Sequence, residues 1–331
     1  MQRMAISSGT LAPPEFDVEP YRRELTAYCY RMLGSGFEAE DAAQEAIVRA
    51  WKNRESFEGR SALRSWLYRI ATNVCLDMLR SKLRRARPME LGPSSMAATA
   101  VLSTLPEEAW VTPVADRSVL DDAADPAEVV AAKESIRLAF VAALQHLPAK
   151  QRAVLILREV IKWQASEVAE LLDTSVASVN SALQRARATL ADRIARAEGG
   201  VPAAEPMDAA QKELLAKYVD AFERYDIDEL VTLLHDDVVL SMPPYELWLR
   251  GIDNLRSWFL NQGIGCRGSR LVATAANGCA AFGSYRPDPN GGHSPWALQV
   301  IEISGGRIVG HHNFLDTTLF AAFGLPPRLD P

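Results

Sequence analysis

A long stretch without hydrophobic periodicity divides this chain and limits what it can fold into. The stretch runs from Arg87 to about Ala132 and is rich in Pro, Ser, Ala, Asp and Thr, with one short hydrophobic anchor around Leu105 and Trp110. We interpret it as a linker, because a segment of this composition buries too little apolar surface to form a core. A second, shorter break has the sequence EGGVPAAEP. The chain is therefore expected to fold in parts, which we place at residues 18–88, 135–197 and 207–331, with an acidic linker at 89–134.

Composition bounds the class of protein. The 331 residues are 48% hydrophobic and 24% charged, which is apolar material for two or three small cores. No apolar stretch approaches the ~20 residues that cross a bilayer, and the N-terminus lacks the pattern of a secretory signal. The four cysteines are scattered, without the spacing of a zinc site or of a disulfide framework, and we interpret them as small core residues: Cys29, Cys75, Cys266 and Cys279. We expect a cytoplasmic protein with no metal and no cofactor.

Charge is segregated along the chain, although the net charge is only −6. Residues 60–88 hold eight Lys and Arg against one acid, and residues 135–197 hold nine against five. Residues 89–134 hold two basic residues against nine acids, and residues 207–331 hold ten against fifteen. Two basic blocks are typical of nucleic-acid binding, and the acidic segments offer a surface that competes with DNA for them.

Three amphipathic helices are predicted in the first piece. Apolar residues at helical spacing end at Gly34 in the first helix, reach Trp51 in the second, and begin after an N-cap at Ser61 in the third. The third helix is expected to continue into a basic run that ends at Arg87. Trp51 is expected in the core.

The second of these helices has an outward stripe at i, i+3, i+4 spacing. Its members are Asp41, Gln44, Glu45, Val48 and Lys52. A stripe of this kind is often only a solvated helix face, and the other interpretation is a surface for a partner.

The second piece has the pattern of a helix-turn-helix. The run QRAVLILREVI forms one helix after Pro148, and WQASEVAELLDTSVASVNSALQRARATL fits two helices joined by a tight turn at Asp173 and Thr174. Residues at helical spacing from Val179 to Leu190 face inward. The outward residues are short and polar or cationic, which suits base edges and phosphates: Ser175, Ala177, Ser178, Asn180, Ser181, Gln184, Arg185 and Arg187. An ordinary helical hairpin is the alternative.

The third piece predicts helices followed by a curved antiparallel sheet, an α+β cone. Turns at Asn277-Gly278 and Gly305-Gly306 join its alternating strands. Such a cone encloses a pocket, for which the candidates are Asp226, His235, Trp248, Trp258, His293, Trp296, His311, His312 and Asp316. Because His311 and His312 are adjacent on a strand, at most one faces inward. The sequence offers no nucleophile–base pair, so no catalytic residue is predicted.

At residues 18–197 the chain resembles a bacterial sigma-70 family factor of the extracytoplasmic function group. EAEDAAQEAIVRAW and RSALRSWLYRIATNVCLDMLRSKLRR are similar to region 2, and LQHLPAKQRAVLILREV with the helix-turn-helix is similar to region 4. The third piece resembles the SnoaL-like domain of the nuclear-transport-factor fold, and FLDTTLFAAFGLP resembles the sigma factor G group of actinobacteria. The resemblance implies a multidomain protein with two all-α sigma domains followed by the cone.

The resemblance also implies partners and roles. Asp41, Gln44, Glu45 and Val48 would face the β′ subunit of core RNA polymerase, which is bound through β′ and β. Region 2 would recognise and melt the non-template strand of the −10 element through Arg60, Arg64, Tyr68, Arg69, Asn73, Arg80, Lys82, Arg84 and Arg85. Region 4 would read the −35 duplex through the outward residues of the helix-turn-helix, Ser175 to Arg187, that are named above. Many relatives have Gly where this chain has Asp173.

The cone is expected to regulate these activities by contacting both sigma regions or the linker, with a small ligand as one route of control. The sign of that control is left open. Two alternatives also remain at this stage: a helix-turn-helix regulator that binds operators without polymerase and senses a ligand through the cone, and a cyclase or hydrolase fused to DNA-binding helices.

Overall fold

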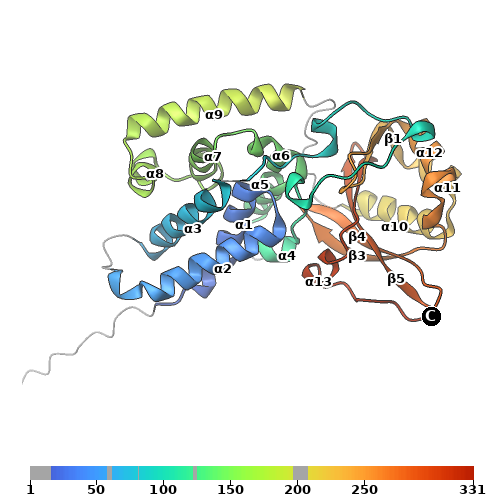
Figure 1. Ribbon diagram of the computed structural model, residues 1–331, viewed down its shortest axis with the longest axis horizontal. Coiled ribbons are helices and arrows are strands. Elements are labelled where there is room, and N and C mark those ends of the chain that lie inside the picture. The colour runs from blue at the N-terminus through green and yellow to red at the C-terminus, as the bar shows by residue number, and fades with distance from the viewer. Residues whose placement is uncertain (1–15, 58–61, 81, 122–124, 197–207) are drawn as a thin grey trace, which may run out of the picture.

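The computed structural model describes residues 16–57, 62–80, 82–121, 125–196 and 208–331. Helices form one half of the molecule, and a sheet with its own helices forms the other (Figure 1). Within the described residues, every helix is too short or too polar to reach across a bilayer. The four cysteines are free thiols.

The first helical domain is a bundle in which α1 packs on α2 and α3. Its elements are η1 (Glu19–Tyr21), α1 (Arg22–Leu33), α2 (Gly36–Lys52), η2 (Arg54–Ser56) and α3 (Leu63–Leu79). Gly34 ends α1 in a left-handed conformation, φ 73°, and the Ser35 hydroxyl accepts a hydrogen bond from the Glu38 N–H to cap α2. Small residues such as Ala39, Ala42 and Ala46 are buried on α2, which lets the helices approach closely.

Two expectations for this domain are wrong. The third helix ends at Leu79, so the basic run follows it outside any helix. Its N-cap is Ala62, and Ser61 lies outside the described residues. Trp51 is 51% exposed and lies at the surface, where its ring contacts Phe16 edge-on at 6.1 Å and Arg54 lies over it at 5.3 Å.

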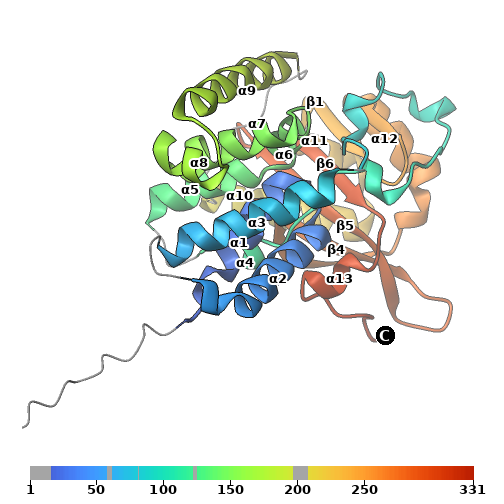
Figure 2. The ribbon, with the colours of Figure 1, turned by 60° about the vertical axis from the view of Figure 1, so that its left-hand side comes forward.

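The second helical domain packs directly on the first (Figure 2). It contains α5 (Pro126–Ile136), α6 (Leu138–Gln145), α7 (Ala149–Leu155), the π-helical turn η6 (Ile156–Val160), α8 (Ala165–Leu171) and α9 (Val176–Arg196). The predicted helix-turn-helix is present as α8 and α9. Asp173 occupies its turn with a left-handed φ of 49°, which explains why glycine suits this position.

In its described residues, the segment predicted as a linker passes along the sheet domain and then enters the shared core, where Val111, Val114 and Leu120 are buried. It forms short turns η3 (Pro88–Glu90), η4 (Ala97–Thr99) and η5 (Glu107–Ala109), then α4 (Asp116–Val119), and the end of the predicted linker already belongs to α5. Trp110 is 2% exposed, as expected of an anchor, and Leu105 is half-buried. Backbone hydrogen bonds attach the segment to the sheet domain at Ser95, Leu105 and Ser103. It is therefore a structural part of both halves.

The C-terminal domain is a six-stranded sheet in the order β2-β1-β6-β5-β4-β3, covered by helices. The helices are α10 (Ala209–Arg224), α11 (Ile227–Thr232), α12 (Ile252–Leu260), η7 (Gln262–Cys266) and α13 (Leu319–Ala322). The strands are β1 (Leu234–Ser241), β2 (Trp248–Arg250), β3 (Arg270–Ala276), β4 (Cys279–Pro287), β5 (His293–Ser304) and β6 (Arg307–Phe314).

The α+β class is confirmed, with one correction to the sheet. The predicted turns at Asn277-Gly278 and Gly305-Gly306 join the antiparallel pairs β3–β4 and β5–β6. However, β1 pairs with β6 in parallel, so the sheet is mixed. The short strand β2, which pairs with β1 through Trp248, was not predicted because three residues show no periodicity.

One face of the sheet shares a core with the sigma-like helices. Buried side chains of α1, α2, α6 and α7 form a continuous hydrophobic cluster with sheet residues such as Ala281, Leu298 and Val300. The opposite face packs against α10 and α12 in a second cluster, to which Tyr218 and Phe222 belong. The three parts of the chain therefore fold as one body.

This close packing predicts the effect of one added methyl group. An ideal Cβ at Gly36 would lie 2.4 Å from the Pro113 carbonyl oxygen, whereas one at Gly92 would meet nothing within 4 Å. We expect Gly36→Ala to destabilise the protein by about 1–3 kcal/mol despite its better helix propensity. Thermal unfolding of both variants checks this: Gly92→Ala should match the unsubstituted protein, and an equal melting temperature for Gly36→Ala would show that the linker is not seated on α2.

Candidate functional site

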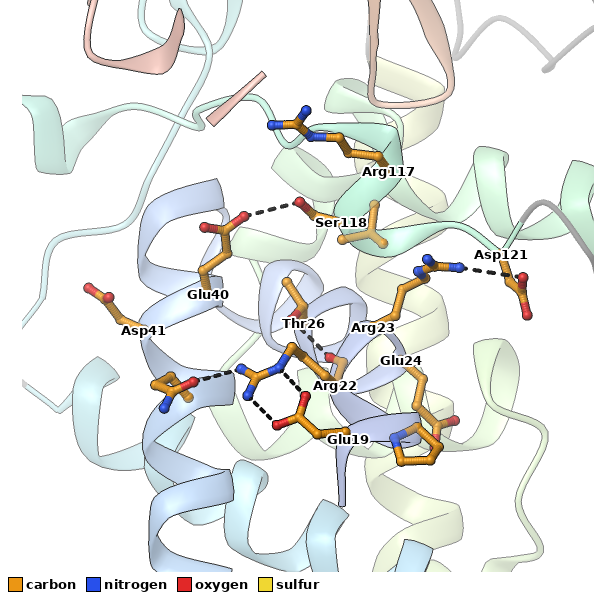
Figure 3. A pocket seen from close by; sticks show the side chains of 13 residues that line it. Glu19, Arg22, Arg23, Glu24, Thr26, Glu40, Asp41, Arg117, Ser118 and Asp121 are labelled. Carbon is orange, nitrogen blue, oxygen red and sulfur yellow. Dashed lines mark hydrogen bonds and ion pairs between the residues drawn. The ribbon is translucent and has the colours of Figure 1, made fainter. Parts of the chain in front are cut away.

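The outward face of α2 borders an open cleft of about 890 Å³ between α1, α2 and α4 (Figure 3). Asp41, Gln44 and Glu45 are exposed, and Val48 is half-buried. Gln44 Oε1 accepts a hydrogen bond from Arg22 Nη1 at 2.6 Å, and Glu45 pairs with Arg49 at 2.7 Å. Asp41 makes no hydrogen bond or ion pair with the described residues. The face therefore presents an uncompensated carboxylate to solvent.

The cations on α3 are largely engaged within the molecule. Arg64 pairs with Glu24 at 2.7 Å, and Arg69 Nη2 donates to the Glu170 carbonyl oxygen of α8 at 3.1 Å. Asn73 and Arg80 are exposed. The predicted melting helix thus keeps part of its polar face free while region-4-like residues hold another part.

Tyr68 was expected to contact a base, and in this arrangement it is buried. It is 1% exposed and lies with its ring 5.2 Å from Tyr28 and 5.0 Å from Trp163, which precedes α8. Burial raises the pKa of Tyr68. The spacing of residues along α3 places Tyr68 next to the polar face of this helix, as expected. The second helical domain covers the Tyr68 side chain in this arrangement.

The basic run after α3 divides into structural and exposed cations. Arg85 was expected to contact DNA, and in this arrangement it is 6% exposed, pairs with Glu38 at 2.6 Å and donates to the Trp110 carbonyl oxygen at 2.7 Å. Lys82 shares Glu38 at 2.6 Å. Arg84 remains exposed beside His146. Arg60 lies outside the described residues.

The helix-turn-helix presents all of its predicted reading residues to solvent. The Ser175 hydroxyl accepts from the Ser178 N–H at 3.1 Å and caps α9, while Val179 and Ala186 are fully buried. The exposed residues are Ser175, Ala177, Ser178, Asn180, Ser181, Gln184, Arg185 and Arg187. Arg187 also pairs with Glu159. Short exposed side chains of this kind are the type that reaches base edges in a major groove.

Two buried arginines hold the helical domains together without a carboxylate. Arg31 of α1 donates from Nη2 to the Ser135 hydroxyl at 2.6 Å, and Arg152 of α7 donates to the Met32 and Gln145 oxygens. Each is 5% exposed, and burial lowers the pKa of each guanidinium to about 10. Sequence reasoning missed both, because a single cation within an apolar helix gives no sign of where its partner lies.

Asn277, at the tip of the β3–β4 hairpin, joins all three parts of the chain. Its Nδ2 donates to the Tyr30 hydroxyl at 2.7 Å and to the Ile136 carbonyl oxygen at 2.6 Å. Its Oδ1 accepts from the Val114 N–H at 3.1 Å. The residue is fully buried and has a φ of 56°. The predicted Asn-Gly turn is therefore also an interdomain contact.

The cone contains a small, partly open cavity of about 170 Å³. Of the predicted pocket residues, Trp258, Trp296 and His311 line it. Trp248 instead donates from Nε1 to the Gly92 carbonyl oxygen, and His293 contacts the Gly268 carbonyl oxygen.

The remaining pocket candidates have structural roles or lie at the surface. His312 points to the other face beside Glu302 at 3.4 Å, so only one of the two adjacent histidines faces inward, as expected. Asp226 caps α11, His235 is exposed, and Asp316 accepts from the Thr318 N–H.

Hydrogen bonds fix His311 as a neutral imidazole. Asn313 Nδ2 lies 2.9 Å from His311 Nδ1, which leaves Nε2–H to donate to the Tyr218 hydroxyl at 2.7 Å; that hydroxyl donates to Gln299 Oε1 at 2.7 Å. Burial and the charge of His312 lower the pKa of His311 to about 3. Tyr218, Gln299 and Asn313 were not predicted, although residues 311 and 313 share a strand face by their spacing of two.

Three family models match this chain in order. Sigma-70 region 2 matches residues 18–85, Sigma-70 region 4 matches residues 137–190, and the SnoaL-like domain matches residues 215–311.

Relatives match over nearly the whole chain or over about half of it. The chain is 45% identical over 313 residues to the "ECF RNA polymerase sigma factor SigG" of Mycobacterium tuberculosis, which covers 94% of this chain and 83% of that protein. It is 33% identical over 173 residues to "ECF RNA polymerase sigma factor SigW" of Bacillus subtilis, covering 52% and 84%. The crystal structure of M. tuberculosis SigJ has the same fold, with a TM-score of 0.57 and 24% identity over 93% of this chain and 98% of that one.

The matched order of domains and the length of the similarity agree with the helical and cone architecture described above. Such factors bind core RNA polymerase and promoter DNA, and the members of this family are not enzymes. The chain belongs to the extracytoplasmic function family of RNA polymerase sigma factors and has a C-terminal SnoaL-like domain.

Proposed function

We propose that the cone and the linker hold this sigma factor in a closed arrangement, and that core RNA polymerase opens it. The contact that carries the proposal is the cover over α3: Trp163 lies on Tyr68, and the Glu170 carbonyl oxygen accepts from Arg69. A melting helix must meet an unpaired strand, which needs an accessible cationic and aromatic surface. Separation of α8 from α3 supplies that surface.

The two DNA faces differ in the closed arrangement. The reading residues of α9 are exposed, whereas part of α3 is covered. The closed factor therefore has its −35 surface free, and its −10 surface becomes complete only on opening. A promoter that contacts both DNA surfaces binds the open state more tightly than the closed state. Promoter binding therefore shifts the equilibrium towards the open state, because a ligand favours the conformation for which it has the higher affinity.

Neutral contacts form most of the attachment of the cone to the sigma domains. The expected docking of acidic cone residues on basic sigma faces is limited to one buried site: despite its burial, Glu302 of the cone has a lowered pKa, because of His312 and of the cations Arg137 and Arg87. Among the described residues, no cone carboxylate forms an ion pair within 4 Å with a sigma-domain cation. The contacts are the shared apolar core and the amide of Asn277. The closed state is therefore proposed to be insensitive to salt, in contrast to DNA binding.

We assign the α2 face to core polymerase and leave catalysis out of the cone. Asp41, Gln44, Glu45 and Val48 supply an acidic and polar stripe with an apolar neighbour, which is typical of an interface with a basic helix. In the cone, both nitrogens of His311 are occupied by Asn313 and Tyr218, so it has no free position from which to take a substrate proton. We place the action of the protein in the cytoplasm, where it meets polymerase and chromosome.

The polymerase assignment predicts that Asp41→Ala weakens binding to core RNA polymerase about tenfold, or ~1.4 kcal/mol. The loss follows from removing an exposed carboxylate that has no recorded partner within the described residues. Fluorescence anisotropy of labelled full-length protein titrated with core enzyme measures it. Asp253→Ala, an exposed acid on α12, is the matched control. Equal affinity of Asp41→Ala and the control would remove α2 from the interface.

The closed-state proposal predicts that Asn277→Gly raises transcription. Glycine keeps the left-handed backbone at this position and removes three side-chain hydrogen bonds, which costs the closed state about 1–3 kcal/mol. The open fraction then rises at least about fivefold while it is the minor state. Run-off transcription at limiting factor should increase several-fold, with Asn290→Gly as the exposed control. Unchanged or reduced output from a folded Asn277→Gly protein would contradict the model.

The buried neutral imidazole predicts a pH effect on stability. Because the pKa of His311 is lowered to about 3 in the folded protein, the unfolded chain binds an extra proton below its own pKa near 6.5. The folded state therefore loses stability as the pH falls from 6.5 towards 4. The melting temperature of His311→Gln should fall less over this interval than that of the unsubstituted protein, whereas the exposed His235→Gln should follow it. Identical pH profiles for His311→Gln and the unsubstituted protein would refute the assignment.

A further inference from the structure

The cone cavity has the size of one ring and its substituent. Its volume is about 170 Å³, close to a cavity of roughly 150 Å³ that holds benzene. Aromatic and aliphatic side chains form most of the wall: Phe222, Leu240, Met242, Trp258, Phe259, Trp296 and Leu315. Sites for drug-sized ligands begin at ~300 Å³, so the volume of this cavity suits a single ring.

One wall of the cavity holds a cation that lacks an anionic partner. The guanidinium of Arg286 lies over the Trp296 ring, with Cζ 3.3 Å from the centroid. Its Nη2 reaches only Cys266 Sγ, at 3.2 Å, and its Nε is buried without a hydrogen-bond partner. No carboxylate of the described chain lies within 4 Å of it. The described chain therefore leaves the charge of this guanidinium without an anionic partner, and the Arg286 side chain lines the cavity.

The charge of the cavity has a single sign. Arg286 is the one charged side chain among the described residues that line it, since His311 is neutral. A guanidinium offers a planar fork of donors that matches a carboxylate.

Two buried amides in the cavity wall complete a polar end. Gln299 is 2% exposed and Asn313 is 8% exposed. Each uses one end of its amide within the His311 chain, and within the described residues neither Gln299 Nε2 nor Asn313 Oδ1 has a recorded partner. One free donor and one free acceptor suit a hydroxyl or keto substituent on the bound ring.

The linker between the sigma regions forms part of the same wall. Leu102 lines the cavity. The residues beside it are tied to the cone, because the Leu105 N–H donates to the Pro244 carbonyl oxygen at 3.1 Å and the Glu246 N–H donates to the Ser103 carbonyl oxygen at 3.0 Å. A molecule in the cavity therefore touches the segment that joins region 2 to region 4.

We propose that the cone cavity binds a small single-ring carboxylic acid, with its carboxylate on Arg286, and that Leu102 transmits its presence to the sigma domains. The transmission half of this proposal rests on the closed arrangement proposed above. Occupancy changes the contact between Leu102 and the cone, and so the balance between the closed and open states. Binding and transcription are measured separately so that either half can fail alone.

The binding test uses full-length protein and paired probes. Benzoate, phenylacetate and cyclohexanecarboxylate are compared with benzyl alcohol, 2-phenylethanol and cyclohexylmethanol by saturation-transfer NMR titration. We expect at least one acid to bind tenfold more tightly than its alcohol, and Arg286→Gln to abolish that preference. Arg267→Gln, an exposed cation stacked on Tyr225 outside the cavity lining, should retain it. An absent preference, or one that survives in Arg286→Gln, would overturn the site.

The transmission test uses the preferred acid in run-off transcription. We expect saturating acid to change output at least threefold with the unsubstituted protein. Leu102→Ser, assayed at an acid concentration that saturates this variant in the NMR titration, should show less than half of that change. If the acid binds but leaves transcription unaltered, or if Leu102→Ser responds fully, transmission through the linker is wrong while the binding site stands. The Asn277→Gly result reports on the closed arrangement independently of any ligand.

Discussion

The amide of Asn277 connects the three parts of the chain, and the arrangement of the sigma domains depends on it. It donates to Tyr30 of the first helical domain and to the Ile136 carbonyl oxygen of the second, and it accepts from Val114 of the linker. A buried polar side chain is stable only when its donors and acceptors are satisfied together. The closed arrangement is therefore cooperative: loss of any one neighbour leaves the others with an unsatisfied group.

The same interface is built so that it can separate. Arg31 and Arg152 are buried between the helical domains and are paired with neutral oxygens, not with carboxylates. Burial without an opposing charge penalises a cation, as their lowered pKa values show. Opening returns both guanidinium groups to water, which offsets part of the apolar contact that is lost. Such an interface holds the closed state with a modest free energy, within reach of a large partner such as polymerase.

Sequence periodicity predicted the elements but not the relations between domains. The helix-turn-helix and the β3–β4 turn were predictable because their signals are local: a spacing of 3.6 or 2, and an Asn-Gly pair at positive φ. The burial of Tyr68 and the exposure of Trp51 were not, since each depends on which domain lies against that helix face. The proposed anion site at Arg286 was not predictable either. It depends on the lack of a carboxylate near the guanidinium among the described residues, and this is visible only in the folded structure.

The order of the linker follows from the domains around it and not from its own composition. Its larger buried side chains, such as Val111, Val114 and Leu120, belong to the core that the helical domains share with the sheet, and its backbone bonds to the cone at Ser95, Ser103 and Leu105. A segment that owes its order to surrounding domains loses that order when they separate. Because Leu102 lies in this segment and also lines the cone cavity, the linker is the part of the chain whose conformation depends on polymerase at one end and on the cavity at the other.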